Sequence, residues 1–207
     1  MTPVTEDPAA DIAWMRRLAE EGRATPMQGA GILLGAGLIF GTASLGHWAV
    51  FSGLVGGGAA TVNLLWLGAT ALFFAVLVLN IVRLRRSEGV RTAANRASST
   101  AWAAVGWGVF ALFVSLAALA WKLGGPAAEV GFALIPSVIM VFYGAGWAVS
   151  AAMQRSRVLW MLAIGAFVAA PLLAALTGQA EQYLAYAVAL YLLAALPGGW
   201  LMRAARG

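Results

Sequence analysis

The sequence VNLLWLGATALFFAVLVLNIV at residues 62–82, which runs directly into RLRR at 83–86, decides the fold of this chain. An apolar run of this length suits a helix that crosses ~30 Å of hydrocarbon, which takes ~20 residues. Five more runs of similar length lie at residues 27–51, 99–121, 130–153, 158–177 and 180–202. We therefore predict an all-α polytopic integral membrane protein with six transmembrane helices as three hairpins, preceded by a short amphipathic interfacial helix.

The composition agrees with this class. Hydrophobic residues make up 62% of the chain and charged residues 10%, whereas charged residues approach ~25% in soluble domains. We expect a cytoplasmic leader at residues 1–25 and a single transmembrane domain at 26–207, which leaves no room for a separate catalytic or sensory domain. The chain has no cysteine, which excludes disulfides, thiolate metal sites and a cysteine nucleophile.

The basic residues predict the orientation of the protein in the membrane. Arginines precede the first run, join the second run to the third and the fourth to the fifth, and follow the sixth, while the opposite loops contain Lys122 as their only basic residue. The positive-inside rule then places both termini in the cytoplasm. This explanation accounts for the net charge of +5 without a nucleic-acid partner, since the arginines form no stripe and no recognised binding motif.

The leader contains a predicted helix at residues 11–22, with Asp11 as its N-cap and Gly22 at its end. Trp14 borders the apolar face, and Arg16 and Arg17 lie on the polar face. A helix this short is marginal alone in water, so the bilayer surface or another protein should hold it. Two roles stay open, which are an interfacial anchor and a docking helix for a cytoplasmic partner.

The leader and the first run also carry a resemblance. The stretch DIAWMRRLAEEG at residues 11–22, followed by a glycine-rich run that closes on GHW at 46–48, resembles the opening of a group of uncharacterised bacterial six-span inner-membrane proteins. The resemblance covers the first quarter of the chain. It implies a bacterial plasma membrane as the location and implies no activity.

Glycine spacing in the first run predicts close helix packing. Gly31 and Gly35 are four residues apart, as are Gly37 and Gly41. This spacing lets helix backbones approach closely in a bilayer. Whether these glycines meet a helix of the same chain, a second copy or another membrane protein is left open by the sequence. An ancestral triplication of the hairpin is equally open, because charge bias alone would make the hairpins alike.

The best ligand site that the sequence offers lies near an intramembrane proline. A proline inside a span removes a backbone donor and frees a carbonyl for a neighbouring side chain, water or ion. Ser137 follows such a proline and Tyr143 lies two turns further along, so we predict a small polar site at Ser137 and Tyr143, with Asn80 from the second run. The three prolines inside predicted spans are Pro136, Pro171 and Pro197.

Aromatic residues near the ends of the runs are expected to anchor the helices at the headgroup level. Trp107 and Trp147 sit deeper, where packing between helices or stacking on a ligand would be their role. The predicted anchors are Trp48, Trp66, Trp121, Tyr183 and Tyr186 at the outer side and Trp102, Trp160 and Trp200 at the inner side.

Catalytic residues are scarce at membrane depth. The middle of each run lacks Asp, Glu, Lys and Arg, which argues against a proton-coupled transporter or ion pump. One histidine, His47, cannot form a zinc or bis-histidine haem site, and we expect it to bond water or headgroups. The HExxH, GxSxG and P-loop patterns are missing. We therefore predict no enzyme, no catalytic residue, no metal and no cofactor.

Two functions remain. The first is a non-catalytic structural, accessory or regulatory subunit of a membrane assembly, whose partners are the lipid bilayer and either a membrane protein or further copies of itself. The alternative is a small channel or transporter for an uncharged or weakly charged solute, with a path past Pro136 and Pro171.

Overall fold

The computed structural model describes residues 12–14, 29–86 and 93–204, and the regular structure of these residues is helical throughout. Six helical segments are long and apolar enough to span a membrane, which confirms the all-α polytopic fold. The helices are α2 (Ala30–Phe51), α3 (Ala59–Arg86), α4 (Ala93–Leu123), α5 (Gly125–Ala133), α6 (Ile135–Gln154), α7 (Arg157–Ala175), α8 (Glu181–Leu190), the π-helix η1 (Tyr191–Ala195) and α9 (Leu196–Ala204).

The short leader helix is described only in part. Residues 12–14 are helical, and Ile12 and Trp14 are exposed. The rest of the helix predicted at 11–22, including Arg16 and Arg17, lies outside the described residues. The choice between a membrane anchor and a docking helix therefore stays a prediction.

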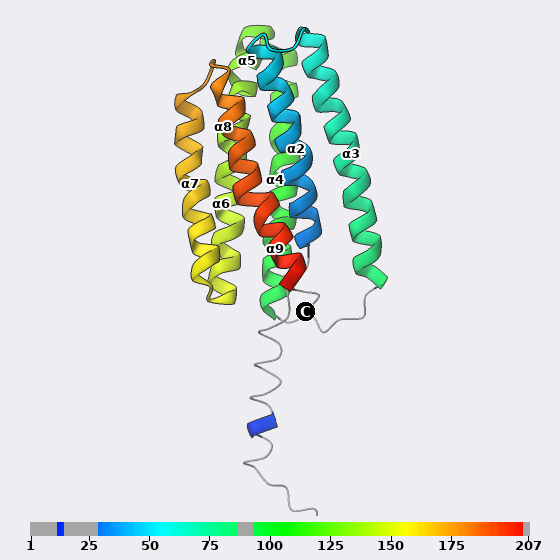
Figure 1. Cartoon of the computed structure of the whole chain (residues 1–207), viewed down its shortest axis with the longest axis vertical. Coiled ribbons are helices and arrows are strands. Elements are labelled where there is room, and N and C mark those ends of the chain that lie inside the picture. The colour runs from blue at the N-terminus through cyan, green and yellow to red at the C-terminus, as the bar shows by residue number, and fades with distance from the viewer. Residues whose placement is uncertain (1–11, 15–28, 87–92, 205–207) are drawn as a thin grey trace, which may run out of the picture.

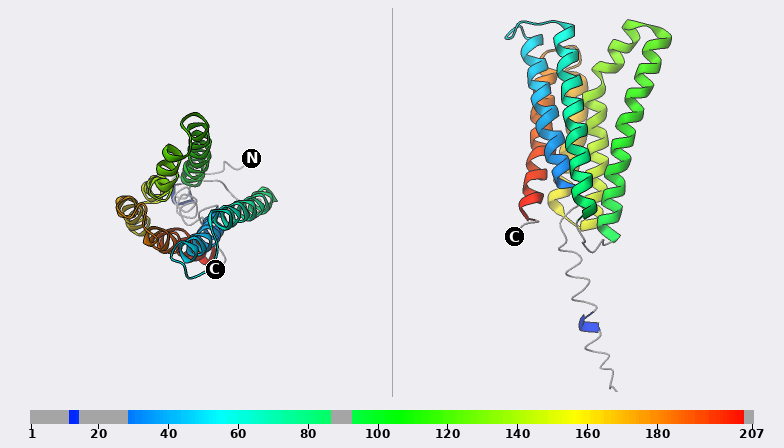
Figure 2. Two further views of the ribbon diagram at one scale, coloured as in Figure 1. Left: turned by 90° about the horizontal axis from the view of Figure 1, so that it is seen from above. Right: turned by 90° about the vertical axis from the view of Figure 1, so that its right-hand side faces the viewer.

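The spans stand side by side in one curved row (Figures 1 and 2). Along the row the order is α3, α2, the last span with α8, η1 and α9, then α7, α6 and α4. The links from α2 to α3, from α4 to α5 and from α7 to α8 lie at the end that we call distal, at the top of Figure 1. The last helix, α9, ends at the opposite, proximal end.

The chain forms three consecutive hairpins, but the two helices of a hairpin are not always each other's main packing partners. In the third hairpin, α7 packs more extensively against α6 than against α8, and α8 packs more extensively against α2 than against α7. The first and last spans of the chain are therefore neighbours, and α3 and α4 are left at the two ends of the row.

One side of α2 packs closely against α3 because of Gly31 and Gly35. A Cβ atom at Gly31 would lie 2.5 Å from Oδ1 of Asn80, and one at Gly35 would lie 2.8 Å from Cγ1 of Val76. A side chain at Gly31 would require the Asn80 side chain to shift, and one at Gly35 would require the Val76 side chain to shift.

The other side of α2 packs against the last span. A Cβ atom at Gly37 would meet the backbone nitrogen of Ala195 and lie 2.8 Å from its Cα atom, and one at Gly41 would lie 2.9 Å from the ring of Tyr191. Gly198 makes a similar close contact from α9, where a Cβ atom would lie 2.5 Å from the backbone nitrogen of Leu34. Gly31, Gly35, Gly37 and Gly41 thus all make close contacts within one chain.

The distal end differs from the prediction in the fourth span. The sequence suggested a loop at residues 122–129 and one helix at 130–153, whereas α4 runs to Leu123, α5 follows directly and a break separates α5 from α6. Pro136 explains the break, because it lacks a backbone donor and is favoured in the first turn of a helix, where it stands in α6. Gln182 of α8 donates from Nε2 to the carbonyl of Ala133 beside the break, at 2.8 Å.

The sixth span contains a π-turn that the apolar pattern did not indicate. The backbone N–H of Leu196 donates to the carbonyl of Tyr191, five residues earlier. Pro197 cannot donate to the carbonyl of Leu193, four residues earlier. The indole N–H of Trp147 on α6 supplies that bond, at 2.9 Å, and Trp147 is 0% exposed. Packing is thus the role of this deep tryptophan.

Two residues predicted as interfacial anchors belong to the interior instead. Tyr186 is buried. Trp102 donates from Nε1 to Oγ of Ser150 at 3.1 Å and meets Tyr143 and Trp147 edge-on. The reason is that both face neighbouring helices rather than lipid, a distinction that depth along the sequence does not reveal.

Candidate functional site

The structure separates the residues of the predicted ligand site. Asn80 lies on α3, donates to a carbonyl of its own helix at 2.8 Å and packs on Gly31 of α2. Ser137 and Tyr143 lie on α6, which packs against α7 and α4. Asn80 is therefore not brought together with the other two.

Ser137 and Tyr143 also have structural roles of their own. Ser137 donates to the carbonyl of Ala170 on α7, at 2.7 Å. Tyr143 is buried, with its ring 5.5 Å from that of Trp102 between centroids. These contacts tie α6 to its two neighbours in the row.

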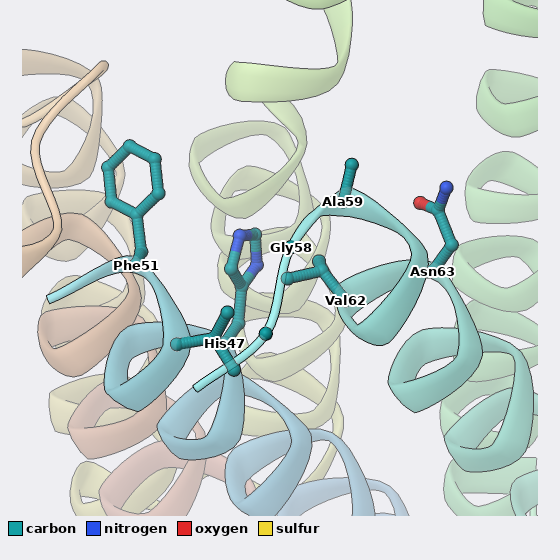
Figure 3. Close-up of a pocket in the computed structure, with 8 residues that line it drawn as sticks. His47, Phe51, Gly58, Ala59, Val62 and Asn63 are labelled. Atoms are coloured by element: carbon teal, nitrogen blue, oxygen red, sulfur yellow. The ribbon is translucent and has the colours of Figure 1, made fainter. Parts of the chain in front are cut away.

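A different cavity is found at the distal end, where α2 meets α3. Its volume is about 370 Å³, and its walls come from the last turns of α2, the connecting loop and the first turn of α3 (Figure 3). The lining residues are His47, Val50, Phe51, Gly57, Gly58, Ala59, Val62 and Asn63. We call this the His47 cavity.

The loop and the antiparallel hairpin place His47 at the centre of this site. The ring of His47 stands between Phe51 and the loop at Gly58 (Figure 3). Trp66, on the facing side of α3, donates from Nε1 to Nδ1 of His47 at 3.1 Å. The ring of Tyr183, at the start of the last span, lies against the imidazole with 3.5 Å between the centroids.

These contacts determine which nitrogen of His47 carries the proton. An indole N–H can only donate, so the Trp66 bond requires Nδ1 to be an acceptor. The neutral imidazole therefore carries its proton on Nε2. Among the residues that the structure describes, none bonds Nε2. His47 thus presents an N–H donor at Nε2. The Trp66 bond to Nδ1 fixes the orientation of the ring.

The walls of the His47 cavity favour an uncharged guest. The lining contains apolar side chains, glycine backbone and the Asn63 amide, and none of the lining residues is acidic, lysine or arginine. An ion would find no counter-charge on these walls. Across the described part of the chain, no three His, Cys, Asp or Glu side chains gather where they could hold a metal ion.

The sequence drew attention to His47, but its contacts with Trp66 and Tyr183 were not predicted. The available signal was that His47 and Trp66 stand near the same end of two consecutive spans, which an antiparallel hairpin brings together. The contact with Tyr183 had no such signal, because it depends on the last span packing beside the first.

Comparisons with known proteins add no relative, since no protein-family model, curated protein or solved structure matches this chain.

Proposed function

We propose that this protein is a non-catalytic subunit of a membrane assembly, with a structural, accessory or regulatory role. The observation that carries the proposal is the position of two glycines, Gly68 in α3 and Gly106 in α4. A Cβ atom at either glycine would meet nothing within 4 Å. The other helical glycines whose surroundings are described each meet a neighbouring segment.

An unpacked glycine inside a helix is unfavourable, since glycine costs ~1 kcal/mol relative to alanine there. Close approach of another helix is the usual compensation in a bilayer. Gly68 and Gly106 lie on the two helices that end the row (Figure 2). This placement is what two contact surfaces for further subunits would require.

The rest of α3 agrees with this reading. It packs mainly on α2, and Ala69 is its only buried residue among those whose exposure is described. Ala71 and Ala75 continue the small exposed surface beyond Gly68 at helical spacing. Large apolar side chains flank that surface, and they are Leu64, Leu67, Leu72, Phe74, Val78 and Leu79.

Native mass spectrometry of the protein, extracted from its own membrane with bound lipid, tests the assembly. We expect a stoichiometric partner or a defined number of copies, and we expect Gly68→Leu or Gly106→Leu to release it, because leucine blocks close approach. Ile164→Phe, on the exposed face of α7, is the control that should leave the mass unchanged. A monomer in the unaltered protein would contradict the proposal.

We further propose that the membrane is a bacterial inner membrane and that the proximal end faces the cytoplasm. The arginines at the helix ends and in the turn between α6 and α7 support this orientation, because cytoplasmic flanks are enriched in basic residues. Those whose side chains the structure describes are Arg83, Arg96, Arg155, Arg157 and Arg203. Lys122, at the distal end of α4, is the exception.

Single cysteines test the orientation, since the chain has none of its own. In intact cells, an impermeant maleimide should label Gly56→Cys in the distal loop, where added atoms meet nothing within 4 Å. Ala204→Cys, exposed at the end of α9, should react only after the cells are permeabilised. Labelling in the reverse pattern would place the termini outside.

The alternative function, a small channel or transporter for an uncharged or weakly charged solute, draws support from the His47 cavity alone. Reconstitution into liposomes separates the two proposals. Solute flux by a monomer would favour the transporter, whereas a stable complex without flux would favour the subunit.

A further inference from the structure

We propose that the His47 cavity binds an uncharged carbonyl compound with a flat apolar ring. This inference goes beyond the subunit role, and it holds or fails whether or not the chain assembles with partners. It rests on a fixed hydrogen-bond donor, on apolar walls without charge and on the size of the cavity.

The donor selects the chemistry of the guest. Because Trp66 occupies Nδ1 of His47, the free Nε2–H can only donate, and its partner must be an acceptor. A carbonyl oxygen meets that requirement without bringing a charge. A guest whose only polar group is a donor would find no acceptor on the imidazole.

The position of the donor is held by contacts on two sides. Tyr183 stacks against one face of His47 at 3.5 Å between centroids, and Phe51 approaches edge-on at 6.2 Å. A donor that is already oriented loses little conformational entropy when it binds. Phe51 is itself more than half exposed, so its ring is free to cover a flat guest.

The size of the cavity limits the guest to one or two rings. At about 370 Å³, it lies near the lower end of small-molecule sites, which span ~300–1,000 Å³. Val50, Val62 and Ala59 give an apolar surface on which such a ring gains from leaving water. The Asn63 amide at the start of α3 offers a second polar contact.

The test uses the full chain without a histidine tag, in which His47 is the only histidine. With ¹⁵N-labelled histidine, the imidazole gives one pair of nitrogen signals, and these report directly which nitrogen is protonated. The probe is 1-tetralone, and its match is tetralin, which has the same rings without the carbonyl. Dialysis gives the free concentration of each compound, so partition into the detergent is subtracted.

We expect the proton on Nε2 before any addition, and a shift of that signal with 1-tetralone. We expect 1-tetralone to bind about fivefold more tightly than tetralin, which corresponds to one ordinary hydrogen bond. Trp66→Phe should reduce the preference because the tautomer is then no longer fixed. Trp48→Phe, a neighbouring tryptophan that does not line the cavity, should leave the preference unchanged.

Three results would overturn the inference. They are a proton on Nδ1 in the free protein, equal binding of the two compounds, and a tetralone preference that survives in His47→Phe. Should His47→Phe fail to fold, the first two results still decide, because both are measured on the unaltered chain. A partner complex without any tetralone preference would leave the subunit proposal standing and remove this one.

Discussion

Gly37→Ala is expected to lower the free energy of unfolding by about 3 kcal/mol, in the range of overpacking changes in well-packed cores. The added methyl group would meet the backbone nitrogen and Cα atom of Ala195. Backbone atoms cannot rotate away as a side chain can, so the last span must move away from α2. The measurement is unfolding of the purified protein in mixed micelles, followed by helical circular dichroism.

Two matched variants test whether the cost comes from the contact with the backbone of Ala195. Gly41→Ala should cost less than Gly37→Ala, because the group in the way is the ring of Tyr191, which can shift. Gly68→Ala should not destabilise the monomer and can stabilise it by up to ~1 kcal/mol, since its surroundings are open. Equal losses for Gly37→Ala and Gly68→Ala would show that α2 does not contact the last span this closely.

The six spans could be predicted from sequence because length and apolar content decide whether a helix can cross a bilayer. The segment at residues 62–82 is the clearest example, and it lies inside α3, which extends about one turn to either side. The prolines indicated where the backbone would be irregular, and the break at Leu134 and the π-turn lie just before Pro136 and Pro197, but the form of each irregularity was not predicted. Hydropathy measures which side chains are apolar and carries no information about backbone hydrogen bonds.

The order of the helices in the row could not be predicted from the sequence either. The glycines of the first run indicated close packing, but either α3 or the last span could have used them, and the structure shows that both do. The His47 cavity follows from the same arrangement. Trp66 could be paired with His47 through the hairpin, whereas Tyr183 reaches His47 only because the last span lies beside α2.

Trp147→Phe is expected to cost about 2–3 kcal/mol of unfolding free energy. The change removes the N–H that bonds the carbonyl of Leu193 at 2.9 Å, and a buried carbonyl without a partner costs ~1–3 kcal/mol. The smaller ring adds a cavity at a site that is 0% exposed. Trp107→Phe is the control, because Trp107 is 72% exposed and should be nearly neutral.

Pro197→Ala separates the lost hydrogen bond from the lost volume. Alanine restores a backbone N–H four residues after Leu193, so the carbonyl gains a donor within its own helix and no longer depends on Trp147. In that background Trp147→Phe should cost about 1–2 kcal/mol less than it does in the unaltered chain, a coupling within the range measured for groups that share one partner. If the two changes are additive, the indole N–H does not compensate for the proline, and the π-turn must be stabilised by other contacts. A measured coupling would mean that Pro197 and Trp147 act as a pair across two spans, which explains how an intramembrane proline is tolerated in the tightly packed last helix.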